Sequence, residues 1–181
     1  MTDRPKPRPA HAIAVEVCAG DWAGAFPGLE ERATALALAV FDGEAARLGG
    51  RWAEVSLLFT DDAEVARLNE AFRGRAGPTN VLSFPSGLLD GRAPRPDGMT
   101  VLPVGDVALA FETVAREART QGKAFADHAG HLVVHGLLHL FGFDHAGVEE
   151  TRVMEDLERS VLSRFGIPDP YADEAEEALH G

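Results

Sequence analysis

The stretch that decides the fold reads His135-Gly136-Leu137-Leu138-His139-Leu140-Phe141-Gly142-Phe143-Asp144-His145. It ends an apolar segment that we expect to be helical from about Phe125 to Phe141. On a helix, residues four apart project from the same face with Cβ atoms roughly 5–6 Å apart. The spacing therefore predicts that His135 and His139 can reach one metal ion together.

A third histidine follows the helix. Gly142 comes three residues after His139, where it can end the helix in a left-handed conformation and turn His145 back toward the pair. Three neutral imidazoles leave a fourth tetrahedral position for water, which is typical of catalytic zinc. We therefore predict that His135, His139 and His145 hold one Zn²⁺ ion, with Ni²⁺ and other borderline ions also compatible with imidazole ligands.

Two more histidines and one acid lie near this set. His131 and His139 are two turns, or about 12 Å, apart on the helix, so three consecutive helical ligands fit one ion poorly. We expect His131 and His128 to support the ligands from behind or to lie in the core. Asp144 either orients a ligand imidazole or caps the turn.

The rest of the chain predicts strands first and helices later. Alternating or apolar runs indicate strands at 13–17, 55–59, 79–84 and 107–110, and amphipathic patterns indicate helices at 29–48, after the capping residues 60–62, at 112–121 and at 149–165. The segment 86–100 reads as a loop, and a βαβ-like unit is expected between the second and third strands. The fold class is thus α+β, a single domain with a small mixed four-stranded sheet packed with helices.

Composition bounds the architecture and the compartment. The 181 residues, 45% of them hydrophobic, suffice for one core. We expect a flexible Pro-rich N-terminus at 1–12, one hydrolase domain at 13–166 and an acidic tail at 167–181. The only cysteine is Cys18 and no secretion signal or membrane span is visible, which favours a cytoplasmic protein.

The formal net charge of −12 argues against a general attraction to nucleic acid, because phosphate binding is driven by Lys and Arg. Much of the negative excess lies in the last residues of the chain. A local basic surface near Arg67, Arg73 and Arg75 therefore remains open.

The histidine spacing matches that of metzincin-type zinc proteases, so a metalloprotease is one alternative. Those enzymes place a glutamate base directly after the first histidine. Here that position is Gly136, which cannot act as a base, and Asp144 is the nearest carboxylate in sequence. This substitution weakens the peptidase hypothesis.

Several separated motifs resemble the YbeY family of bacterial endoribonucleases. The histidine segment fits the family pattern, with Phe143 where tyrosine is usual. Two further segments, Leu68-Asn69 to Phe72-Arg73-Gly74 and Pro78-Thr79-Asn80-Val81-Leu82-Ser83-Phe84-Pro85, resemble the other family signature, and Gly105-Asp106 fits the start of its last strand. Asn80 stands where the family usually has Asp.

The resemblance implies a zincin-like architecture and a single-strand-specific, metal-dependent endoribonuclease acting in ribosomal RNA processing and quality control. RNA and ribosomal small-subunit components would be its partners. It also implies that Arg73 is catalytic, through a bidentate contact with the scissile phosphate. From the sequence alone, a solvated arginine at a helix end is the competing interpretation.

Other assignments stay open. The general base is unassigned, and we expect Ser83 to be structural. A second alternative is a ribosome assembly factor without catalytic activity, whose metal only stabilises the fold.

Overall fold

The interior strand β2 (Trp52–Thr60) has alternate side chains buried along most of its length. A computed structural model of the chain describes residues 11–89 and 91–172. Its strand order is β1-β2-β4-β3. The parallel strands are β1 (Ala12–Val17), β2 (Trp52–Thr60) and β4 (Val101–Ala110), and β3 (Val81–Pro85) pairs antiparallel with β4 at the edge. The predicted mixed four-stranded sheet is therefore confirmed.

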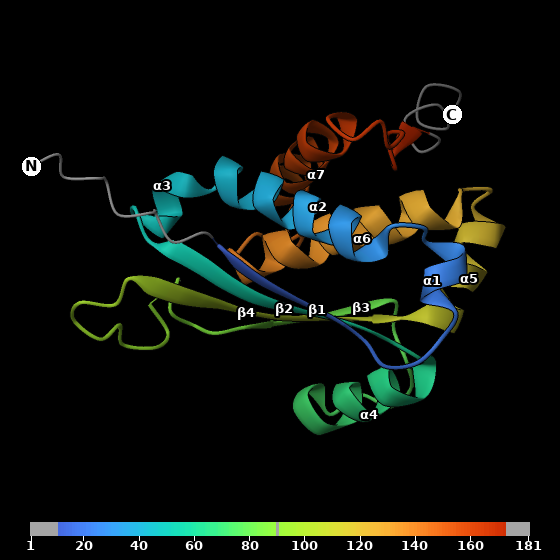
Figure 1. Cartoon of the computed structure of the whole chain (residues 1–181), viewed down its shortest axis with the longest axis horizontal. Helices are drawn as coiled ribbons and strands as arrows, with labels where there is room; N and C mark the ends of the chain where they lie inside the picture. The colour runs from blue at the N-terminus through green and yellow to red at the C-terminus, as the bar shows by residue number, and fades with distance from the viewer. Residues whose placement is uncertain (1–10, 90, 173–181) are drawn as a thin grey trace, which may run out of the picture.

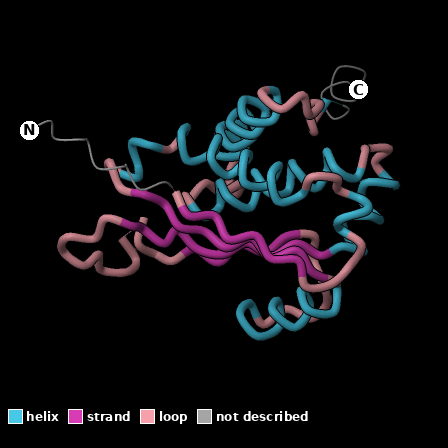
Figure 2. Tube along the Cα trace, viewed as in Figure 1, coloured by secondary structure: helices cyan, strands magenta, loops and turns pink. Residues whose placement is uncertain are grey.

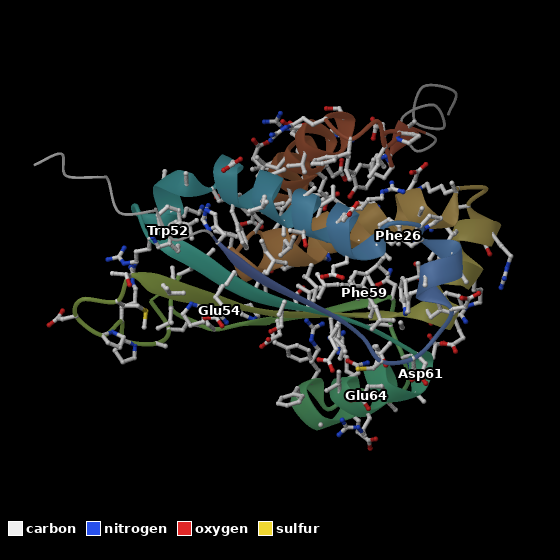
Figure 3. The ribbon with its side chains drawn as sticks, in the orientation of Figure 1. Phe26, Trp52, Glu54, Phe59, Asp61 and Glu64 are labelled. Atoms are coloured by element: carbon white, nitrogen blue, oxygen red, sulfur yellow. The ribbon has the colours of Figure 1, made fainter. Side chains whose placement is uncertain are left out.

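Helices cover the two faces of the sheet unequally (Figures 1 and 2). Among the described residues, one face carries α1 (Trp22–Ala25), α2 (Leu29–Gly43), α3 (Ala45–Leu48), α5 (Phe111–Thr120), α6 (Phe125–Leu140) and α7 (Val148–Ser163), and the other carries only α4 (Asp62–Arg73). The main core fills the layer between the sheet and the larger set of helices, where Figure 3 marks Phe26 and Phe59. Within it α6 packs against α2, α7, β3 and β4.

Helix α4 begins as its sequence predicts. The Asp61 side chain accepts a hydrogen bond of 2.9 Å from the Glu64 backbone N–H, an N-cap that satisfies one of the free donors of the first turn (Figure 3). The helix ends at Gly74, whose φ of +64° suits glycine. This places Arg73 in the last helical position, beside β3.

Three details differ from the expected elements. The βαβ-like unit between the second and third strands is wrong, because β3 is antiparallel to β4; the parallel unit is β1–α2–β2. The helix expected at 29–48 is interrupted at Glu44, which separates α2 from α3. Strand β4 begins at Val101 because Gly105, with φ +137°, lets the register shift while the pairing continues.

The described ends of the chain pack onto the fold. The His11 ring accepts a 2.8 Å hydrogen bond from the Ala53 backbone N–H, and Ile167 is 6% exposed. Ordered structure thus extends into both segments that we expected to be tails, while residues 1–10 and 173–181 lie outside the described part. In that part, no helix combines the length and apolar character needed to cross a membrane.

Candidate metal centre

Helix α6 and the turn after it bring together the three predicted histidines. His135 and His139 face each other with Nε2 atoms 3.1 Å apart. Gly142 adopts φ +85°, and the Phe143 N–H bonds to the Leu138 carbonyl, which reverses the chain. The His145 ring then lies 5.1 Å from that of His139 and 5.7 Å from that of His135, and ligand nitrogens of all three lie within 4.8 Å of one another.

A buried carboxylate lies behind this cluster. Glu158 of α7 is fully buried, and its Oε1 is 2.8 Å from His135 Nδ1 while its Oε2 is 3.0 Å from His131 Nε2. Burial raises the pKa of Glu158, but the hydrogen bonds and positive charge of the two histidines outweigh it and lower that pKa to about 2. Within the described residues, His131, His135 and Glu158 form a second group whose donor atoms could hold a metal ion.

Hydrogen bonding fixes the tautomers of the facing pair. His139 Nδ1 lies 2.9 Å from the Phe143 carbonyl oxygen, which only accepts, so this nitrogen carries the proton. His135 Nδ1 likewise donates to the Glu158 carboxylate. In the neutral rings both Nε2 lone pairs then point at each other across 3.1 Å, and either a metal cation or a proton on one of the two rings would relieve their repulsion.

The protonation of His139 also suits a ligand. Burial lowers its pKa below the ordinary value of 6.5, and charge on His135 or His145 lowers it further. Only a neutral imidazole can donate a lone pair to a metal. The three residues therefore fit a borderline divalent ion such as zinc.

The cluster opens into a cleft of about 390 Å³ that Arg73 and Arg92 also line. Arg73 Nη2 donates to the Ser83 carbonyl oxygen at 3.2 Å, which holds the guanidinium beside β3. Arg67, in contrast, pairs with Glu64 on α4 and does not line the cleft. The basic residues at the site thus come from the end of α4 and from the loop after β3.

Gly136 does not face this cleft. A Cβ added to it would lie 2.7 Å from Val107 Cγ1 and 3.1 Å from Val81 Cγ2, so α6 sits directly on β3 and β4 at this residue. Ser83 belongs to the same contact, since its buried hydroxyl donates to the Gly136 carbonyl at 2.9 Å, the structural role that we expected. Position 136 has no room for a side chain that could serve as a base.

Comparison with known proteins shows the family of the chain. The family model described as Endoribonuclease YbeY matches residues 29–166. The chain belongs to the YbeY family. It is 47% identical over 170 residues to Endoribonuclease YbeY of Chelativorans sp., covering 91% of this chain and 95% of that protein, and 51% identical over 166 residues to the Rhodospirillum rubrum protein of that name, covering 89% and 82%. It is also similar to TM1509 from Thermotoga maritima, at 23% identity and a TM-score of 0.49, covering 84% and 91%.

The departure from the YbeY signature at Asn80 has a local explanation. Asn80 Nδ2 donates to Glu117 Oε2 at 3.0 Å, and the same oxygen lies 2.9 Å from Nε2 of the buried His128. Aspartate at this position would face the Glu117 carboxylate with a like charge. The amide supplies a donor instead, while its oxygen accepts from the Val81 N–H at 2.7 Å.

Sequence reasoning missed Glu158 in this YbeY chain. Two roles were open for Asp144, and it caps the turn by accepting from the His145 N–H at 2.8 Å; its Oδ1 also lies 3.8 Å from His145 Nδ1, and its side chain is 66% exposed. A signal for Glu158 was present in its position. It falls on the same face of α7 as the buried Met154 and Val161, where an acid needs buried partners.

Proposed function

We propose that this chain is a metal-dependent endoribonuclease that cleaves single-stranded RNA during maturation and quality control of small-subunit ribosomal RNA. His135, His139 and His145 would bind one Zn²⁺ ion. The observation that carries the proposal is the convergence of three histidines, with Nε2 of His135 and His139 3.1 Å apart, beside a cleft that His139, His145 and Arg73 line.

The bound ion would polarise the scissile phosphate or lower the pKa of a water molecule. The protein contributes ligand orientation: Glu158 and the Phe143 carbonyl hold Nδ1 of His135 and His139, so that the Nε2 atoms of the two rings face each other. His145 completes the set from the turn and is 56% exposed, which leaves that side of the cluster open to a substrate.

Arg73 would bind the phosphate itself. Its hydrogen bond to Ser83 uses only one of the five N–H groups of a guanidinium, so a pair remains for two non-bridging oxygens. Negative charge increases on these oxygens in the transition state, and a fixed guanidinium stabilises it there. Arg73 would thus act at the reaction centre, in the cleft that His139 and His145 also line.

The charge of the cleft favours RNA, and the preference for a single strand follows from the family resemblance. The cleft of about 390 Å³ adjoins a hollow of about 820 Å³ that shares Arg73, Ser83 and Pro85 with it. With a chain charge of −12, attraction to RNA depends on this local concentration of arginine and metal charge. Small-subunit ribosomal components as partners, and the cytoplasm as compartment, follow from the proposed substrate.

The decisive test is cleavage of a structured ribosomal RNA fragment by metal-analysed protein. Arg73→Ala should lower kcat/KM roughly a hundredfold or more, by analogy with loss of one charge-stabilising donor. Arg67→Ala is the matched control, because it removes an arginine from the same helix outside the cleft. His139→Ala should abolish cleavage and serves as the contamination control. Cleavage by Arg73→Ala at the parental rate would refute its role.

The same preparations separate the alternatives. A metalloprotease would hydrolyse casein, but the packing of Gly136 leaves no room for its usual base. A non-catalytic assembly factor would cleave no RNA, while chelation would still lower its melting temperature.

A further inference from the structure

Glu158 is a buried acid that has no direct contact with substrate in the proposed reaction. Its side chain is 0% exposed, it does not line the cleft, and it contacts His135 at Nδ1, the ring nitrogen that does not face His139. Burial of an ionised carboxylate costs several kcal/mol unless hydrogen bonds replace its water. An acid at this position therefore needs a set of donors, and the fold supplies them from two elements, α6 and the segment after α7.

The donors divide unequally between the two oxygens. His131 Nε2 and the Tyr171 hydroxyl both contact Oε2, and His135 Nδ1 contacts Oε1. The two partners on Oε2 fix the rotation of the carboxylate, and this directs Oε1 at the His135 ring. The positions of His131 and Tyr171 thus determine, through Glu158, how the His135 imidazole is oriented.

Tyr171 reaches Glu158 from beyond α7. It belongs to residues 167–172, here called the C-terminal strap. The strap is anchored at two points: Lys123 Nζ donates to the Pro170 carbonyl at 2.8 Å, and Arg159 Nε donates to Asp169 at 3.2 Å. The Arg159 guanidinium also lies 5.0 Å from the centre of the Tyr171 ring. These contacts hold the hydroxyl over the buried carboxylate.

We propose that Glu158 and Tyr171 are positioning residues for the metal, with the C-terminal strap holding His135 in its binding orientation through Glu158. The inference rests on the metal site proposed above. It also means that the second cluster, His131, His135 and Glu158, binds no metal ion of its own. Its role is to orient His135 for the single ion of the cleft. A second ion would need the Nδ1 proton of His135 removed while Nε2 serves the first, and it would displace donors that already satisfy Glu158.

The test measures zinc affinity and stoichiometry by competition with a chromophoric chelator, without any RNA. Glu158→Gln should weaken zinc binding roughly 10- to 100-fold, the effect typical of losing a carboxylate behind a ligand histidine. Tyr171→Phe keeps the ring packing and removes only the hydroxyl, and it should weaken binding by a smaller factor. Glu149→Gln is the matched control: it neutralises an exposed carboxylate of the same helix and should bind zinc like the parent.

The double variant distinguishes positioning from general loosening. If Tyr171 acts through Glu158, the variant with both substitutions should bind zinc no more weakly than Glu158→Gln alone. Full additivity of the two losses, parental affinity in Glu158→Gln, or two zinc ions per parent chain would each overturn the inference. Circular dichroism and melting of the chelated variants verify that they are folded. A parent chain that binds no zinc would instead refute the metal site on which the inference rests.

Discussion

Replacing Gly136 by alanine tests the tight contact between α6 and the sheet. In a helix interior the change ordinarily stabilises by up to about 1 kcal/mol. Here the new methyl group would lie 2.7 Å from Val107 Cγ1 and 3.2 Å from Ser83 Oγ. Val107 is β-branched and buried, and Ser83 is held by its bond to the Gly136 carbonyl, so neither moves aside easily.

Overpacking of this kind costs roughly 1–3 kcal/mol. We therefore expect Gly136→Ala to lower the free energy of unfolding by roughly 1–2 kcal/mol once the helix gain is subtracted. The displaced helix should also weaken zinc binding, because His135 and His139 flank the site of the change.

Gly43→Ala is the matched control, since it lies in α2 with no heavy atom within 4 Å of its added Cβ. It should be neutral or stabilise by up to about 1 kcal/mol. The two variants should thus differ by about 2 kcal/mol, or roughly thirtyfold in the unfolding constant, in urea titrations of chelated protein. A Gly136→Ala protein as stable as the parent would refute the packing argument.

Three further predictions follow from the geometry. Gly105→Ala should lower the free energy of unfolding by roughly 3 kcal/mol or prevent folding, because φ is +137° and the Cβ would collide with the Phe84 carbonyl oxygen. Gly91→Ala is the control, since Gly91 has a positive φ but open space around it. It should lower the free energy of unfolding by only about 1 kcal/mol in the same urea titration. Burial lowers the pKa of both His128 and His139 below 6.5, so the unfolded chain binds more protons. The metal-free protein should therefore lose stability as the pH falls below about 6.5, and His128→Gln should lose less; a flat pH profile of the parent would contradict this. Zinc at about a thousandfold above its Kd should add about 4 kcal/mol, or roughly 10 °C in melting temperature. His145→Ala should lose that gain without changing the melting of chelated protein, since its side chain is 56% exposed; an equal zinc gain in the variant would argue against His145 as a ligand.

The sequence predicted the features that depend on neighbours along the chain. The pairing of His135 with His139 follows from helical periodicity, and the return of His145 follows from the left-handed turn at Gly142. The cap at Asp61 and the edge position of β3 were also predictable, because turn chemistry and a terminal proline act within a few residues. Such features are set by short-range sterics and hydrogen bonding.

The tertiary structure alone decided which distant groups meet. It makes β3 antiparallel, brings Arg73 into the cleft that His139 and His145 line, and places Glu158 beside His135. It also shows that Gly136, which the sequence presented as the position of an absent base, is where α6 packs closely against the sheet. These outcomes depend on how the faces of α4, α6 and α7 pack against other elements, and local sequence patterns do not specify that pairing. The three histidines could therefore be predicted from one short stretch and Arg73 from the family resemblance, whereas the carboxylate behind His135 became visible only in the folded chain.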